Sequence, residues 1–279
     1  PFSHALEDLI VPNIRHEELS LAYMHYFNHL YNGKLNTAID IFTGKYKHKF
    51  LHALVSSQLD TDRLDYLKRD SFFTGVSEGV ISTDRIIKMM NVVNDELVID
   101  VKGLYSVEKF LIARRLMYWQ VYLHKTVVSS EMLLRNIIKR ARQLSMAGEK
   151  LWGPPALNYF LSQDHFELNE TMLGNFAMLD DDDMTASLKI WQDHEDPVLS
   201  RLSHMYVQRK LFKIKLQNQP FSDDEVMLKK QQVAKQFNLD TSGADYFVVS
   251  DILTNNAYKP DGDHITILQK DDSTSDLVE

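Results

Sequence analysis

The chain has 279 residues, of which 44% are hydrophobic and 25% are charged, the profile of a globular protein with one large or two modest domains. It contains no cysteine, so disulfides and thiolate metal sites are excluded, and any bound metal must be held by His, Asp or Glu. The formal charge of −8 argues against general nucleic-acid binding, which normally needs a basic surface. No apolar run could span a membrane and no signal peptide is visible, so we expect a cytoplasmic protein without a membrane partner.

The first third of the chain is predicted to be helical apart from one turn region. Apolar residues recur at helical spacing over residues 17–74. Gly75 and Gly79 then mark turns. Residues 82–84, Ser-Thr-Asp, predict the start of a short helix that ends near residue 90.

A strand pair and a long helix are expected next. The β-branched residues within 96–105 predict two strands that turn at Lys102-Gly103. The amphipathic stretch 106–144 predicts one long helix or two abutting ones. Two glycines and a Pro-Pro pair within 148–155 then form the clearest boundary in the sequence.

After this boundary the sequence predicts more helices and a β-rich tail. Helices are expected over residues 185–194 and 197–216. The tail is expected to form a short β hairpin, with strands in 246–252 and 264–270 and a turn at 259–263. The predicted fold class is therefore mainly α, with a small β element.

The segment SSQLDTDRLDYLKRD, residues 56–70, carries an unusual number of charges for one helix. Asp62, Tyr66 and Asp70 lie four residues apart, so they form a single narrow stripe on that helix. A solvated helix face is the alternative interpretation, because opposite charges four residues apart are common there. The spacing of the three residues favours a functional stripe.

A second stripe is predicted on the helix that contains LIARRLMYWQVYLHKTV. Arg114, Tyr118, Tyr122 and Lys125 share one helix face. Two cations and two phenols suit an anion attached to a planar group, since arginine binds phosphate oxygens bidentately and tyrosine stacks or donates. A buried aromatic stripe with snorkelling cations is the alternative.

The N-terminal residues PFSHALEDLIVPNIRHEELS contain a third set of polar groups. His4, Glu7 and His16 are residue types that serve as acids, bases or metal-orienting groups in hydrolases. By spacing alone the signal is weak, because a single histidine is more often structural.

Together the three segments resemble the HD-domain phosphohydrolases, and specifically their deoxynucleoside triphosphate triphosphohydrolase branch. PFSHALE with HEE, LDTDRLDYLKRDSFFTGV and ARRLMYWQVYLHKTV carry the resemblance, in this order, over residues 1–142. It implies an HD-domain helical core over residues 1–147. Residues 148–279 would form a C-terminal helical region that ends in a short β element.

The resemblance also implies roles for individual residues. Asp62 matches a metal ligand, and His16 and Glu7 match a histidine near the scissile phosphate and its acidic partner. The positions that match substrate contacts in the family are Arg63, Tyr66, Asp70, Arg114 and Tyr122.

A divalent metal is the cofactor that the resemblance implies, with Mn, Fe, Ni, Zn or Mg all open. In the family the other ligands, a His and a His-Asp pair, lie upstream of the segment that matches Pro1. We therefore expect the natural protein to extend upstream and carry them, and the chain as written to be inactive. A lone Asp62 cannot hold a catalytic ion, because such sites need several converging ligands.

The implied reaction is hydrolysis of a dNTP to a deoxynucleoside and triphosphate, in a homo-oligomer. One alternative is an HD phosphohydrolase of other specificity, such as a nucleotidase or an alarmone hydrolase. Another alternative is a nucleotide-binding regulatory protein without catalysis.

Two charged runs add weaker signals. Asp180–Asp183 could bind a cation, although acidic residues before a helix more often serve its N-terminus. The basic run 208–216 could bind phosphates, although a solvated helix face is the simpler interpretation.

Overall fold

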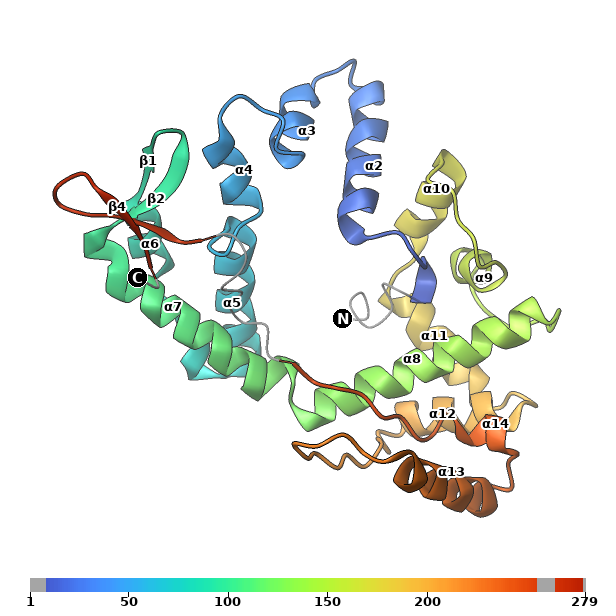
Figure 1. Ribbon diagram of the computed structural model, residues 1–279. Helices are drawn as coiled ribbons and strands as arrows, with labels where there is room; N and C mark the ends of the chain where they lie inside the picture. Colours follow the sequence, from blue (N-terminus) through green and yellow to red (C-terminus); the bar gives the residue numbers. More distant parts are fainter. Residues whose placement is uncertain (1–8, 255–263, 278–279) are drawn as a thin grey trace. The chain divides into compact units, whose positions relative to one another are not determined.

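The structure, a computed structural model, describes residues 9–254 and 264–277 (Figure 1). Helices dominate the described residues, which confirms the predicted fold class. The helices are α2 (His16–Leu30), α3 (Asn36–Phe42), α4 (Lys49–Val55), α5 (Thr61–Thr74), α6 (Thr83–Met89), α7 (Leu104–Met117), α8 (Lys125–Met146), α9 (Pro155–Leu161), α10 (Glu170–Met178), α11 (Asp181–Trp191), α12 (Pro197–Val207), α13 (Asp223–Phe237) and α14 (Thr241–Ala244). The strands are β1 (Met90–Val93), β2 (Glu96–Asp100), β3 (Thr266–Leu268) and β4 (Thr274–Asp276).

The chain divides into two compact units. One unit contains the described residues up to Tyr26 together with Lys125–Ile252. The other contains Phe27–His124 and the described residues from Leu253 onward. Each unit draws on both sides of the boundary predicted at residues 147 and 148. Because compactness alone does not define a domain, that division stays a prediction.

The unit that contains Lys125–Ile252 is built around α8. This helix buries Leu133, Ile137 and Ile138 in a core that also takes in Phe160 and Trp191. Within the described ranges, no helix combines the length and apolar character needed to cross a membrane.

The acidic run at the start of α11 acts as a helix cap. The Asp180 side chain accepts hydrogen bonds from the backbone N–H groups of Asp182 and Asp183, and the Asp183 side chain accepts one from the Asp180 N–H. This reciprocal capping satisfies N–H groups that the helix itself leaves free. The capping interpretation of the acidic run is confirmed.

The unit that contains Phe27–His124 has its own core and the sheet. Leu64 and Leu67 of α5 pack with Phe110 and Met117 of α7. The strands lie in the order β1-β2-β3-β4, with β2 and β3 parallel and the other two pairs antiparallel.

The β1–β2 turn corrects the predicted strand pair. The turn lies at Asn94 and Asp95, whose φ angles are 52° and 66°. Two-residue hairpin turns need positive φ at both central residues, which Asn and Asp tolerate best after Gly. The predicted turn at Lys102-Gly103 is wrong, because those residues belong to the 3-10 turn Val101–Gly103.

The C-terminal predictions are partly wrong. Residues 246–252 form no strand, whereas 264–270 contain β3, whose antiparallel partner β4 the sequence analysis missed. The predicted turn at 259–263 lies outside the described residues. The helix expected over 197–216 ends at Val207, since the chain turns at Arg209, where φ is 54°. The basic run therefore lies outside a helix, and the helix-face interpretation is wrong.

Candidate functional site

Helix α5 presents the predicted stripe. Its first turn is capped by Asp60, whose carboxylate accepts a hydrogen bond of 2.7 Å from the Arg63 backbone N–H. Leu64 and Leu67 are buried, which orients the rest of the helix surface. Tyr66 and Asp70 are half-buried, whereas Asp62 is exposed.

Tyr66 and Asp70 meet residues from the end of α7. Tyr122 donates a hydrogen bond of 2.6 Å from Oη to Asp70 Oδ2. The Tyr122 ring packs edge-on against Tyr66 at 6.3 Å and against Tyr118 at 5.3 Å between centroids. Tyr118 and Tyr122 lie in a short π-helix, Tyr118–Tyr122, that continues α7. Short π-helical segments are rare and frequently occur at functional sites.

Arg114 of α7 is the cation that acts most strongly on the pKa of Tyr66. Its side chain is almost fully buried, and Nη1 donates to Gln58 Oε1 at 3.2 Å. Its Nε is buried without a hydrogen-bond partner among the described residues. Burial raises the pKa of Tyr66, and the positive charge of Arg114 opposes that rise. The cation therefore lies within electrostatic reach of the tyrosine.

Tyr122 is held as a neutral donor. Burial raises its pKa well above the usual range, and the hydrogen bond to Asp70 raises it further. The phenol therefore stays protonated at physiological pH and keeps donating to the carboxylate.

Arg63 differs from Arg114, because its charge is already matched. It forms an ion pair with Asp60 and donates from Nη1 to the Ser57 backbone carbonyl at 2.6 Å. Its Nε is buried without a partner among the described residues. Arg63 thus lies near Tyr66 with part of its guanidinium in use.

The roles predicted for Asp62, His16 and Glu7, as metal ligand and acid–base residues, stay predictions. No group of three His, Asp or Glu side chains in the described ranges could hold a metal ion, so Asp62 alone does not fit one. His16 is the first residue of α2 in the other compact unit and is largely exposed beside Glu17. Glu7 lies outside the described residues.

The sequence analysis missed two buried polar residues, Gln58 and Asp60. The one available signal was the position of Asp60 directly before a helix, where Asp commonly caps. Nothing in the sequence around Gln58 indicates its contact with Arg114, since the two are far apart in the chain.

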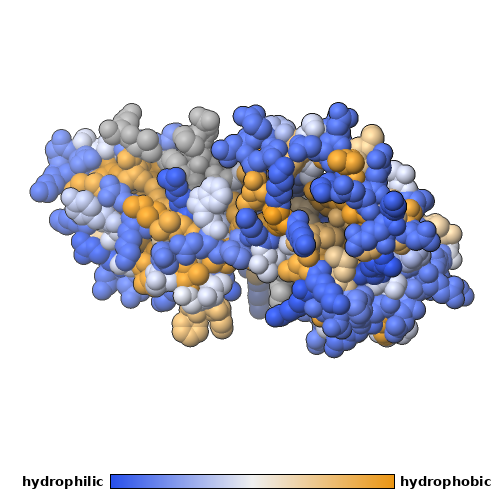
Figure 2. All heavy atoms as spheres, turned by 90° about the horizontal axis from the view of Figure 1, so that it is seen from below, coloured by the Kyte–Doolittle hydropathy of each residue, from blue (hydrophilic) through white to orange (hydrophobic). Residues whose placement is uncertain are grey.

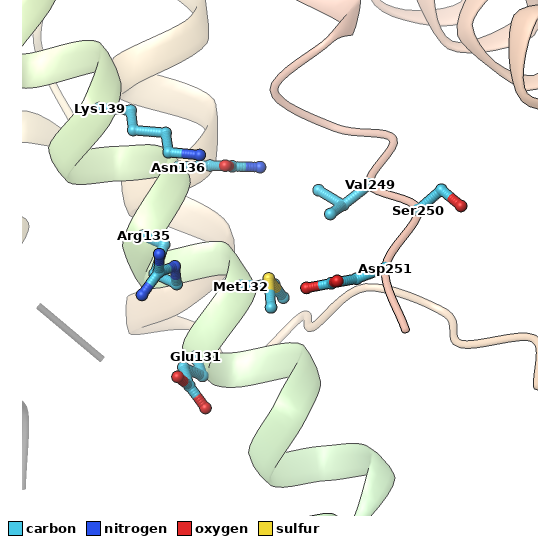
Figure 3. A pocket seen from close by; sticks show the side chains of 8 residues that line it. All are labelled: Glu131, Met132, Arg135, Asn136, Lys139, Val249, Ser250 and Asp251. Carbon is cyan, nitrogen blue, oxygen red and sulfur yellow. The ribbon is translucent and has the colours of Figure 1, made fainter. Parts of the chain in front are cut away.

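A separate cavity of about 490 Å³ lies in the unit that contains α8. In Figure 3 the side chains of Lys139, Asn136 and Met132 on α8 face Val249 and Asp251 across it. Of the predicted site residues that the structure describes, none lines this cavity.

Comparisons with known proteins place the chain in a family. A family model described as the HD associated region matches residues 81–151. A crystal structure of a phosphohydrolase from Bacteroides thetaiotaomicron is 47% identical, with a TM-score of 0.94, over 99% of this chain and 70% of that one. The chain belongs to the HD-domain phosphohydrolase superfamily.

Curated relatives of this HD superfamily member are longer than the chain. YwfO of Bacillus subtilis is 30% identical over 258 residues, 90% of this chain but 57% of that protein. The deoxynucleoside triphosphate triphosphohydrolase SAMHD1 homolog of Dictyostelium discoideum is 23% identical over 207 residues, 68% of this chain and 38% of that protein. The chain thus spans about half the length of these relatives.

Proposed function

We propose that this HD superfamily member hydrolyses nucleotides, and that its substrate is a dNTP, which it converts to a deoxynucleoside and triphosphate. The observation that carries the proposal is the cluster of Arg114, Tyr66, Tyr122 and Asp70. A buried cation with a spare donor suits a phosphate, and the rings and carboxylate suit a nucleoside. The name of the Dictyostelium relative supports the choice of dNTP.

In this proposal each residue of the cluster has one role. Arg114 binds phosphate oxygens and stabilises charge that develops in the transition state. Arg63, whose charge Asp60 already matches, adds one hydrogen bond to a phosphate oxygen. Tyr66 and Tyr122 pack against the sugar or base. One carboxylate oxygen of Asp70 accepts the hydrogen bond from Tyr122, and the other accepts a hydrogen bond from a sugar hydroxyl. A carboxylate has enough acceptor sites for both.

The divalent metal in this proposal is inferred from membership of the superfamily alone. The described residues do not make a metal site by themselves, so no step is derived through one. Asp62 is proposed as one ligand, with the others outside the described residues. His16 and Glu7 are proposed as the acid–base pair near the scissile phosphate, on the resemblance alone.

Hydrolysis of a nucleotide panel by the full-length protein tests the function. We expect dNTPs to yield deoxynucleoside and triphosphate, with slower turnover of ribonucleotides, monophosphates and guanosine polyphosphates. If a monophosphate or an alarmone is turned over faster than dNTPs, the protein is instead a nucleotidase or an alarmone hydrolase. No turnover of any nucleotide despite nucleotide binding would favour the non-catalytic alternative.

Arg114→Gln tests the cluster, with Lys109→Gln as its matched control. Both residues are cations on α7, but Arg114 is buried at the cluster and Lys109 is exposed. A lost charge-assisted hydrogen bond of about 2–3 kcal/mol corresponds to a loss of roughly a hundredfold in kcat/KM. Equal activity of the two variants would remove Arg114 from the site.

We also propose that the protein forms a homo-oligomer through the outer face of α7. Tyr105 and Ile112 of α7 and Trp119 of the π-helix that continues it are each more than half exposed. They lie seven residues apart, in one line along the helix direction. Figure 2 shows that hydrophobic side chains gather in patches on the face drawn there. Exposed Glu108 and Arg115 flank the line, also seven apart, so an antiparallel second copy would pair each Glu108 with an Arg115.

Light scattering on full-length protein tests this interface. Ile112→Asp should reduce the mass to that of a smaller assembly, because it places a charge at the centre of the line. Glu108→Arg should weaken assembly, and adding Arg115→Glu should restore it. A wild-type monomer at micromolar concentration, or unchanged mass in Ile112→Asp, would contradict the proposal.

A further inference from the structure

The loop before α5, Ser57–Asp60, is largely buried although three of its four residues are polar. Gln58, Leu59 and Asp60 are 8%, 4% and 2% exposed. Burying an amide and a carboxylate costs stability unless their hydrogen-bonding groups find partners. The partners of both side chains are the two arginines of the candidate site.

Asp60 organises the loop around Arg63. Its carboxylate accepts from the backbone N–H groups of Arg63 at 2.7 Å and Ser57 at 3.3 Å, and it pairs with the Arg63 guanidinium. The Ser57 carbonyl accepts from the same guanidinium, and the Ser57 hydroxyl accepts from the Leu59 N–H at 3.2 Å. These contacts fix the backbone on both sides of Gln58.

Gln58 is thereby held against Arg114. Its Oε1 accepts from Arg114 Nη1 at 3.2 Å, across 56 residues of sequence, and both side chains are buried. The two arginines thus have partners of different charge. Asp60 neutralises Arg63, whereas the amide of Gln58 orients Arg114, which has no anionic partner among the described residues.

We propose that the Ser57–Asp60 loop is a positioning element for the candidate site, and that Gln58 holds Arg114 in place while keeping its full charge available to an anionic ligand. The inference rests on the proposed function and adds a residue that acts through Arg114. It also explains why an amide stands at this position. A carboxylate of the same shape would hold the guanidinium more strongly and compete with the phosphates for it.

The test compares Gln58→Glu, Gln58→Met and wild type as full-length proteins. Gln58→Glu keeps shape and acceptor but adds a charge, and Gln58→Met keeps length but removes the acceptor. Ser56→Glu is the control, since it adds the same charge at an exposed position in the same segment. Binding of inorganic triphosphate and of an uncharged deoxynucleoside is measured by calorimetry, alongside the melting temperature.

Gln58→Glu should weaken triphosphate binding about tenfold or more, because neutralising one cation removes at least one charge-assisted contact. Deoxynucleoside binding and the melting temperature should barely change. Gln58→Met should show a smaller loss in triphosphate binding, since Arg114 keeps its charge but its side chain is no longer held in place. Ser56→Glu should bind as wild type does.

Arg114→Gln separates this inference from the proposed function. If Arg114→Gln loses triphosphate binding while both Gln58 variants bind normally, the inference fails and the proposed function stands. If all three variants bind triphosphate as wild type does, the proposed function fails and the inference with it. Losses of equal size for triphosphate and deoxynucleoside would show a general structural role for Gln58 and would also overturn the inference. If Gln58→Glu does not fold, the same comparison is made with Gln58→Met.

Discussion

Arg114 and Arg140 are both arginines on helices whose side chains are largely withdrawn from solvent, one in each compact unit, yet their partners differ. Arg140 meets Asp196 bidentately, with Nε to Oδ1 at 3.0 Å and Nη2 to Oδ2 at 2.5 Å. Among the described residues, Arg114 donates only to the neutral side-chain oxygen of Gln58, and its buried Nε has no hydrogen-bond partner there. The first arginine is fully matched and stabilises its unit. The second has donor capacity and charge left for a ligand.

A neutral partner alone does not identify a binding site, as Arg142 shows. Its Nη2 donates to the backbone carbonyls of Ile10 and Phe160, and burial lowers the pKa of its guanidinium. Those contacts tie separate segments of one unit together, which is a structural task. Arg114 differs because phenols and a carboxylate suited to a nucleoside lie around it.

The largest expected effect is on stability, at Asp196. Asp196→Ala removes the ion pair with Arg140 and also the cap of α12, where Asp196 accepts from the Leu199 N–H at 2.7 Å. It leaves a largely buried guanidinium unpaired, so we expect a loss of about 3 kcal/mol in the free energy of unfolding. Urea unfolding of the variant measures this loss.

Asp193→Ala is the control for Asp196→Ala, because Asp193 is exposed in the turn before α12. It should change the free energy of unfolding by less than about 0.5 kcal/mol. If the two variants are equally stable, the Arg140–Asp196 ion pair does not stabilise the fold. Arg140 could then no longer serve as the structural counterpart of Arg114.

The sequence predicted the local parts of the site and not its supports. Helical spacing placed Tyr66 and Asp70 on one face, and the resemblance associated them with Tyr122, which the structure brings into contact with both. The role of these residues as substrate contacts stays a prediction. Gln58 was missed because its burial depends on α7, which the chain reaches only some fifty residues later.

The fold shows the same division between local and distant determinants. Helix starts such as that of α11 are set by neighbouring residues, so they could be predicted. The parallel pairing of β2 with β3, Val98 opposite Thr266, joins distant segments and leaves no local pattern. The β1–β2 turn did leave a local signal at Asn94-Asp95, but the apolar run that continues past it made Lys102-Gly103 the stronger candidate.

A smaller effect is expected in the pH dependence of the Arg140–Asp196 pair. Burial acts to raise the pKa of Asp196, but hydrogen bonds from Arg140 and the Leu199 N–H outweigh it, so the pKa lies below its ordinary value of 3.8. A carboxyl whose pKa is lower in the folded state stabilises the fold above its unfolded pKa and loses that contribution as pH falls through the folded value. The stability difference between wild type and Asp196→Asn should therefore be constant above about pH 5 and shrink below pH 4.

Asp196→Asn suits this measurement because asparagine keeps the helix cap while removing the charge. Urea unfolding at several pH values gives the difference directly. A difference that grows toward low pH would mean that the pair is not formed in the folded state.

The smallest effect is expected at Tyr122, where a single hydrogen bond between half-buried groups is at stake. Tyr122→Phe keeps the ring packing against Tyr66 and Tyr118 but removes the donor to Asp70. We expect a loss of about 0.5–1.5 kcal/mol, a factor of roughly two to thirteen, in dNTP binding or turnover, because Asp70 is no longer fixed.

Because the raised pKa keeps Tyr122 protonated, the ratio of wild-type to variant activity should stay flat from pH 6 to pH 9. Tyr105→Phe, on the exposed face of α7, is the matched control and should act as wild type does. A ratio that changes within that pH range would show that Tyr122 titrates there and does not serve as a fixed neutral donor. The contrast between the Arg114 cluster, with its capacity for a ligand, and the fully paired Arg140 would then lose this support.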